Sequence, residues 1–206
     1  MQRVVVGWGG AGSALVLAAL ILVLTWLPAT LQQQAALQRD VLASGQLWQL
    51  WSGQVVHWSA LHAAADALGV AAAGWLAGAL YGPARVARWL LAAAPLLSLG
   101  ILACQPELAS YRGASGLVVG LGSLAWVGLW RTATVRRRWL VLVALAFVFK
   151  LALAWHAVAM GLPVAGFGLP EGVSVAWSAH VLGALLGLAA GALRTAPDPR
   201  TPAPHR

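Results

Sequence analysis

The sequence predicts an all-α membrane protein built as a bundle of six transmembrane helices. The chain has 206 residues, of which 61% are hydrophobic and 9% are charged, and its mean hydropathy is +0.80. A soluble domain of this size has too little interior to bury so much apolar surface. Apolar runs of about 20 residues, the length that crosses a bilayer, recur along the chain. They lack the alternation of a transmembrane β-barrel, so the spanning elements are predicted to be helices.

Six apolar stretches are the predicted spans. They cover residues 11–30, 56–80, 86–104, 114–130, 139–160 and 173–193. Together they are expected to form one transmembrane domain over residues 1–194, followed by a proline-rich, disordered cytoplasmic tail at 195–206. Because Arg3 precedes the first stretch, a signal peptide is the alternative there, although the length favours a retained helix. Residues 31–54 mix glutamine with leucine and tryptophan, which predicts a partly helical element at the outer interface.

The basic residues predict the orientation of the bundle, whose net charge is +8. One side of the predicted bundle holds Arg3, Arg85, Arg88, Arg131, Arg136, Arg137, Arg138, Arg194, Arg200 and Arg206. The other side holds Arg39 and Arg112. Since cytoplasmic loops are enriched in Lys and Arg, both termini are predicted to be cytoplasmic. This distribution reads as a topology signal, so no nucleic-acid partner is expected. A sole cysteine, Cys104, excludes an internal disulfide and a thiolate metal cluster.

Two polar residues in the apolar stretches are candidates for catalysis. Ser115 opens the fourth span within Gly113-Ala114-Ser115-Gly116, and His180 lies about seven residues into the sixth. Serine becomes a nucleophile when a base takes its proton, and histidine suits that task near neutral pH. Both spans are predicted to run inward from the outer surface, which places the two residues at comparable depth, roughly 10 Å for His180. A helix N-terminus at Ser115 would offer unpaired N–H groups to an oxyanion.

Glycines on the same two spans predict that these helices pack closely. Gly116 and Gly120 stand four residues apart in the fourth span, as Gly183 and Gly187 do in the sixth. Small residues at this spacing let membrane helices approach one another, which would bring the two candidates together. Taken singly, each of these features is more often structural. Their agreement in side and depth favours catalysis.

These motifs resemble those of the rhomboid intramembrane serine proteases. The likeness lies in the Gly-Ala-Ser-Gly motif around Ser115 and in the His-x-x-Gly-x-x-x-Gly motif that begins at His180. A third element is the series His57, His62 and Asp66, which has the spacing of the family's H-x4-H-x3-N pattern. The resemblance covers nearly the whole chain. It implies a six-helix rhomboid-like fold.

The resemblance implies roles for five residues. Ser115 is the expected nucleophile and His180 the general base, a dyad that needs no metal and no cofactor. His62 and the Ser115 backbone N–H are expected to form the oxyanion hole, supported by Gly113 and Asp66. Asp66 stands where the family has asparagine, and a carboxylate donates no hydrogen bond unless it is protonated. It is expected to hold or charge His62 instead.

The short chain with six spans is most similar to the rhombosortase branch of bacterial rhomboids. That resemblance implies cleavage of single-pass membrane proteins near the outer face of the bacterial inner membrane, at C-terminal Gly-Gly sorting signals. The active site would open to the periplasm or the cell exterior, and the partners would be transmembrane substrates and membrane lipids. Transfer of the acyl group to a lipid amine, as in a transpeptidase, is the alternative to hydrolysis. The oligomeric state stays open.

Other polar residues and one loop have expected roles outside the proposed dyad. Lys150 lies mid-way along the fifth span, where an ionisable residue predicts a functional role and a buried partner, either Asp66 or carbonyl groups. His156 is expected to bond locally, and His57 to be structural or near a water entrance. Gln49 stands where the family often has an arginine that orders its outer loop. The glycine-rich loop at 161–172 is either a lid over the site or an ordinary connector.

Two other classes of function stay open at this point. A non-catalytic rhomboid-like protein that binds membrane helices would have no chemical need for both Ser115 and His180. A small transporter would use Asp66, Lys150 and His156 as a proton relay. It would show a flux that the substitution Lys150→Ala abolishes.

Overall fold

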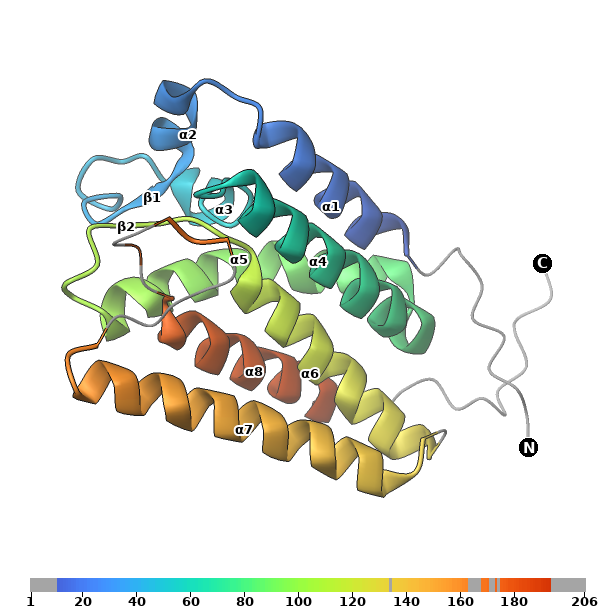
Figure 1. The fold of residues 1–206 in the computed structure, drawn as a ribbon. Helices are drawn as coiled ribbons and strands as arrows, with labels where there is room; N and C mark the ends of the chain where they lie inside the picture. Colours follow the sequence, from blue (N-terminus) through green and yellow to red (C-terminus); the bar gives the residue numbers. More distant parts are fainter. Residues whose placement is uncertain (1–10, 134, 163–167, 171–172, 174, 194–206) are drawn as a thin grey trace, which may run out of the picture.

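The computed structural model is a helical bundle with a small irregular layer at one end (Figure 1). It describes residues 11–133, 135–162, 168–170, 173 and 175–193. The long helices are α1 (Gly12–Leu24), α4 (Ala60–Tyr81), α5 (Pro83–Cys104), α6 (Ser115–Thr132), α7 (Arg137–Ala159) and α8 (Trp177–Ala192). The short elements are α2 (Ala29–Ala35), β1 (Leu37–Gln38), α3 (Gln49–Ser52) and β2 (Ser110–Tyr111). The tail predicted at 195–206 lies outside the described residues.

The prediction of a helical membrane protein is confirmed at this level. A long helix corresponds to each predicted span. Three described helices are long and apolar enough to cross a membrane by length and composition, namely α4, α5 and the Arg137–Ala157 part of α7. Helices α1 and α8 are apolar but shorter. The number of six crossings stays a prediction.

The C-terminal end of α1 and the N-terminal end of α4 differ from the predicted spans, and side-chain hydrogen bonds lie at both ends. Helix α1 ends at Leu24, well before residue 30, and the amide of Gln32 donates to the carbonyl oxygens of Thr25 and Leu27, both at 3.0 Å. These bonds satisfy carbonyls that the helix itself leaves unpaired. Helix α4 begins at Ala60 because the Ser59 side chain caps it, accepting the His62 backbone N–H at 3.1 Å.

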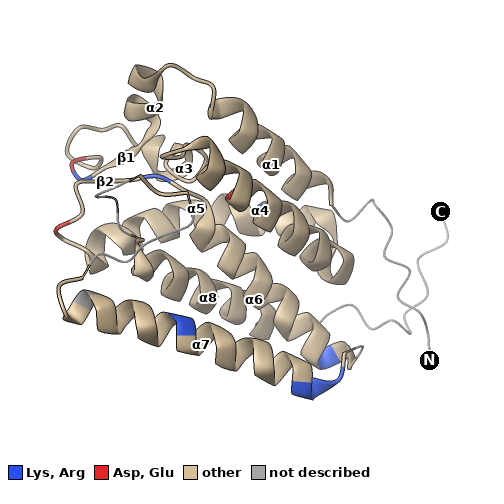
Figure 2. Cartoon of the chain, in the orientation of Figure 1, with Lys and Arg blue, Asp and Glu red and all other residues tan. Residues whose placement is uncertain are grey.

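The long helices alternate in direction, so three N-termini meet at one end of the bundle. In Figure 1, α4, α6 and α8 run from the end that carries α2, α3 and the strands, whereas α1, α5 and α7 run toward it. The first residues of α4, α6 and α8 therefore share one end of the molecule. The basic residues at the end of α6 and the start of α7 lie at the opposite end (Figure 2).

Helix α6 lies at the centre of the packing. Its apolar residues join those of α1, α4 and α5 in the main core, which includes Leu117, Leu121 and Leu124. Helix α8 packs along another face of α6 (Figure 1). Helix α7 is peripheral, because only 6% of its membrane-length window is buried, against 39% for α4 and α5.

The layer above the bundle is fixed by buried polar bonds. Strand β1 pairs antiparallel with β2, and this pairing sets Leu37 opposite Tyr111. The Ser98 hydroxyl of α5 donates to the Leu50 carbonyl at 2.7 Å and accepts from the Gln54 amide at 3.0 Å. The segment predicted to lie at the outer interface is thus partly helical and is anchored to α5.

Gln49 has an ordering role in this layer. Its side chain is buried and accepts the Gln38 backbone N–H at 2.9 Å. It also donates to the Gln34 carbonyl at 3.2 Å and to the Gln46 side chain at 2.9 Å. A neutral amide therefore bridges three parts of the segment between α1 and α4. The charge expected from the family pattern is not needed for that bridging.

Candidate active site

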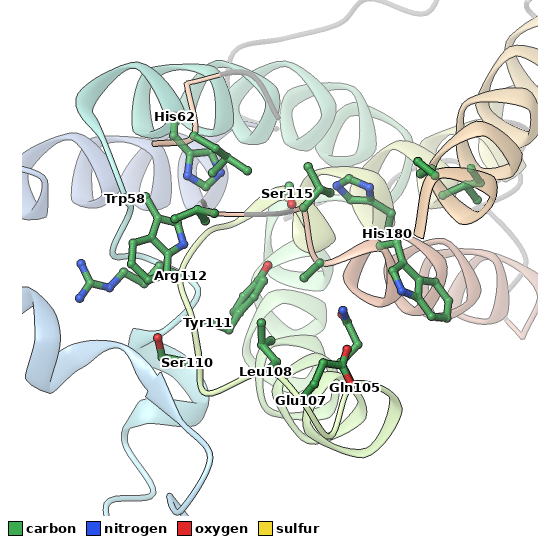
Figure 3. A pocket seen from close by; sticks show the side chains of 18 of the residues that line it. Trp58, His62, Gln105, Glu107, Leu108, Ser110, Tyr111, Arg112, Ser115 and His180 are labelled. Carbon is green, nitrogen blue, oxygen red and sulfur yellow. The ribbon is translucent and has the colours of Figure 1, made fainter. Parts of the chain in front are cut away.

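A cavity of about 960 Å³ opens among the N-terminal halves of α4, α6 and α8, the C-terminal half of α7 and the strand β2. Ser115, His180, His62, Asp66 and Lys150 all line it. Figure 3 shows the first three around this space, with residues of the α5–α6 segment forming its floor. The structure therefore gathers the candidate residues from four helices, α4, α6, α7 and α8.

Ser115 is the first residue of α6 and follows a tight turn. Gly113 has a φ of +136°, a backbone conformation that residues other than glycine rarely adopt. A Cβ at this position would also lie 2.9 Å from His62 Cε1. The Gly113 N–H donates to the Gly53 carbonyl at 3.0 Å. The next N–H, of Ala114, donates to Asp66 Oδ2 at 2.7 Å, so the turn is held on both sides before Ser115 begins the helix.

His180 is brought to Ser115 by glycine contacts between α6 and α8. A Cβ on Gly183 would lie 2.1 Å from the Gly116 carbonyl oxygen, and one on Gly187 would lie 2.1 Å from that of Gly120. The two helix backbones are therefore in direct contact. Ser115 and His180 stand at the end of this contact, where both side chains reach the cavity (Figure 3). His180 itself is 7% exposed.

Asp66 is the centre of a buried polar cluster. Its Oδ2 atom lies 3.0 Å from His57 Nε2 and 3.5 Å from His62 Nε2, and it accepts the Ala114 N–H. The His57 ring is oriented from its other side, because Nδ1 lies 3.2 Å from the Val55 carbonyl. Asp66 thus contacts His62, as expected, but its shorter bonds go to His57 and to the backbone before Ser115.

Tyr111 is a cavity residue that the sequence analysis missed. It ends β2, is 5% exposed, and has its hydroxyl near the Ser115 side chain and the Gly116 backbone (Figure 3). Burial, with the Asp66 carboxylate nearby, raises the pKa of Tyr111 far above its usual value near 10. The phenol therefore stays neutral beside Ser115. Its position four residues before Ser115 was the available signal, but only the strand pairing turns it inward.

Arg112 closes the cavity on the side of the outer layer. Its guanidinium lies 4.5 Å from the Trp58 ring centroid and donates to the Gln33 side chain. Burial lowers the pKa of Arg112 from its usual value. The residue stays cationic at neutral pH because that usual value lies above about 12.

Lys150 does not have the buried partner that was expected. Its side chain is exposed on α7 and lines the cavity, and the ion pairs of the described residues that involve Asp66 are formed with histidines. The reason is the packing, since α7 is peripheral and its C-terminal half faces the cavity on one side and the outside of the bundle on the other. His156, also on α7, is exposed and does not belong to the residues around the cavity.

The described part of the 161–172 loop reaches the cavity. Leu162 and Leu169 line it, and the Gly168 carbonyl accepts a hydrogen bond from the Ser59 hydroxyl at the start of α4. Residues 163–167 and 171–172 lie outside the described residues. The loop therefore contacts the site, which agrees with either of the roles left open for it.

A bundle of apolar helices that encloses a serine, histidines and a carboxylate defines an integral membrane protein with a polar internal site. Comparison with protein families narrows this class. The Rhomboid domain model matches residues 44–197. No curated protein sequence matches the chain significantly.

The chain belongs to the rhomboid family. Members of this family are generally intramembrane serine proteases that act on transmembrane substrates. The matched region contains α3 to α8 and every candidate site residue, whereas α1 and α2 precede it. The resemblance inferred from three short motifs is thus confirmed at the level of the family.

Proposed function

We propose that this protein is an intramembrane serine endopeptidase in which Ser115 is the nucleophile and His180 the general base. The observation that supports this most is that the two residues line one cavity at the end of the direct backbone contact between α6 and α8. His180 takes the Ser115 Oγ proton as the oxygen attacks the scissile carbonyl, and returns it to the leaving amine. Water then hydrolyses the acyl-enzyme. The dyad uses neither a metal nor a cofactor.

The oxyanion that forms during attack lies, in this proposal, between the Ser115 N–H and His62. As the first residue of α6, Ser115 has no acceptor for its N–H within the helix. The bond from Ala114 to Asp66 fixes the peptide next to it, and Gly113 leaves the space that His62 occupies. Preorganised donors of this kind stabilise developing charge at no cost of reorganisation. Asp66 acts here as a positioning residue.

The proposed substrates are single-pass membrane proteins cleaved near the outer face of a bacterial inner membrane. The elements that line the cavity meet at the end of the bundle away from the basic residues of the α6–α7 junction (Figure 2), and the positive-inside rule predicts that this junction is cytoplasmic. The similarity to rhombosortases extends the proposal to substrates with C-terminal Gly-Gly signals. Both termini are then cytoplasmic, and the chain forms one six-span domain.

Labelling with a fluorophosphonate probe tests the proposed dyad. We expect the detergent-solubilised protein to be labelled, and the substitutions Ser115→Ala and His180→Gln each to abolish labelling and peptide-bond cleavage. Ser123→Ala is the matched control, because Ser123 lies on α6 two turns further from the cavity, and it should retain labelling. Labelling that persists in Ser115→Ala would refute the proposal.

The mass of the C-terminus of a co-expressed Gly-Gly substrate tests the finer proposal. A free carboxylate at the new end indicates hydrolysis, and an added amine mass indicates transfer to a lipid. An uncut substrate in cells whose enzyme is labelled by the probe would refute the substrate class while leaving the dyad intact.

A further inference from the structure

The strongest unassigned feature is the cluster of His57, His62 and Asp66. Each side chain offers one nitrogen or oxygen with a lone pair, and these atoms all lie within 4.8 Å of one another. His57 Nε2 lies 3.0 Å from Asp66 Oδ2, and His62 Nε2 lies 3.5 Å from the same oxygen. Three potential ligand atoms thus lie close together, and both histidine nitrogens lie near the same carboxylate oxygen.

The hydrogen bond that His57 makes directs a lone pair, rather than a proton, toward Asp66. Val55 offers a carbonyl oxygen to His57 Nδ1, so the proton of a neutral imidazole belongs on Nδ1 and the lone pair on Nε2. Asp66 Oδ2 already accepts the Ala114 N–H. Two acceptor atoms at 3.0 Å repel each other unless a cation, either a proton or a metal ion, lies between them.

The spacing fits a tetrahedral metal ion. Zinc lies about 2.0–2.1 Å from histidine nitrogen and carboxylate oxygen, which separates two tetrahedral ligands by about 3.3 Å. The observed 3.0 Å and 3.5 Å lie on either side of this value. A ligating histidine commonly donates its other N–H to a backbone carbonyl, as His57 does to Val55. His62 and Asp66 border the cavity, which gives an ion access and leaves room for a water ligand.

We propose that His57, His62 and Asp66 form a binding site for one divalent transition metal ion, with zinc as the fitting ion. The carboxylate is the deciding ligand. Where the family pattern has a neutral asparagine, this chain has an aspartate, and the exchange completes a set of two histidines and one carboxylate. Such a set leaves one tetrahedral position for water.

Metal binding at this site regulates the proposed protease, and this consequence rests on the proposed function. An ion held by His62 occupies the imidazole that the oxyanion hole requires. It also draws Asp66 away from the Ala114 N–H that steadies the turn before Ser115. Zinc is therefore an inhibitor of cleavage, and a chelator restores activity.

Zinc titration calorimetry on chelator-treated protein, purified without a histidine tag, tests the site. All variants carry Cys104→Ser to remove the exposed thiol and Ser115→Ala so that binding is measured without turnover. We expect one zinc per chain. Asp66→Asn and His57→Gln should each weaken zinc affinity by about 100-fold or more. His156→Gln removes a histidine outside the cluster and should bind zinc as the parent does.

Two further measurements keep the test decisive. His62→Gln alters the least buried of the three ligands and covers the case in which a variant at His57 fails to fold, as judged by gel filtration. The visible absorption of the cobalt-substituted parent should show intense four-coordinate bands. Absence of stoichiometric zinc binding, or unchanged binding in Asp66→Asn, would overturn the proposal.

The effect of zinc on cleavage distinguishes a failure of the metal site from a failure of the proposed protease function. With Ser115 restored, zinc should lower the cleavage rate by at least about 10-fold, and the chelator should reverse the effect. If the protein binds zinc but is not labelled by the fluorophosphonate probe, the proposed metal site is supported and the proposed protease activity is refuted. If probe labelling and the cleavage rate are unchanged when zinc is bound at the cluster, the proposed regulation is refuted.

Discussion

At the scale of single residues, one carboxylate oxygen connects several parts of the site. Asp66 Oδ2 accepts the Ala114 N–H and lies within 3.0 Å of His57 and 3.5 Å of His62. An asparagine could accept the same N–H, but it would bring its own N–H groups toward one of the histidines. The exchange of asparagine for aspartate therefore changes which histidine atoms carry protons. The hydrogen bond from the Ala114 N–H, just before Ser115, can form with either residue.

The pH dependence of stability should report the burial of Tyr111. Because burial raises its pKa above the usual value near 10, the folded chain keeps this proton while the unfolded chain releases it. The unfolded state then binds fewer protons, so the free energy of unfolding falls as pH rises above about 10. Denaturant unfolding from pH 8 to 11 should show this loss, and Tyr111→Phe should reduce it.

Tyrosinate absorbance provides the direct control for this prediction. The chain has two tyrosines, so Tyr81→Phe leaves Tyr111 as the only one. The folded variant should show no ionisation near pH 10, whereas the denatured variant should titrate there. A folded-state midpoint near 10 would contradict the burial of the phenol.

At the scale of helices, the contact between α6 and α8 depends on the absence of side chains. Gly183 and Gly187 of α8 touch the carbonyl oxygens of Gly116 and Gly120 on α6. Such contact lets the helices gain dispersion energy along their backbones. It also fixes how far His180 lies from Ser115, so helix packing and the proposed catalysis depend on the same geometry.

A methyl group on Gly187 should loosen this contact. Its Cβ would lie 2.1 Å from the Gly120 oxygen, a backbone atom that moves only with its helix. We expect Gly187→Ala to lower the free energy of unfolding by about 1–3 kcal/mol, measured by denaturant unfolding in detergent, and to slow cleavage. Gly122→Ala on α6 is the matched control, since a Cβ there meets nothing within 4 Å. Equal stability of the two variants would contradict the close contact.

At the scale of the whole molecule, the cavity and the basic residues of the α6–α7 junction lie at opposite ends of the bundle (Figure 2). This polarity gives the orientation a simple test. Ser44 lies in the outer layer and Ala84 at the start of α5, and both are exposed. Each can carry a single cysteine in a Cys104→Ser background.

Labelling of intact cells with a membrane-impermeant maleimide should distinguish the two positions. Ser44→Cys should react from outside, whereas Ala84→Cys should react only after the inner membrane is permeabilised. In a bacterium with an outer membrane, the reagent must be one that passes porins. The reverse pattern would place the proposed active site on the cytoplasmic side.

The sequence by itself determined the class of the protein and the family. Apolar runs long enough to cross a bilayer require helices, because lipid offers no partner for free backbone groups, and three short motifs indicated the rhomboid family that the match over residues 44–197 shows. The helix ends at Leu24 and Ala60 were harder to predict from the sequence, since they depend on hydrogen bonds made by Gln32 and Ser59. The catalytic roles of Ser115 and His180 stay predictions.

Only the tertiary structure decided what surrounds those two residues. It paired Asp66 with His57 and Ala114, turned Tyr111 inward and left Lys150 exposed on α7. Spacing along one helix gives the face on which a residue lies, but it does not give the partner that faces it. Those partners come from segments up to 48 residues away, as Ala114 is from Asp66. Hydropathy and short motifs are local properties, whereas a polar site inside a bundle depends on contacts between distant segments.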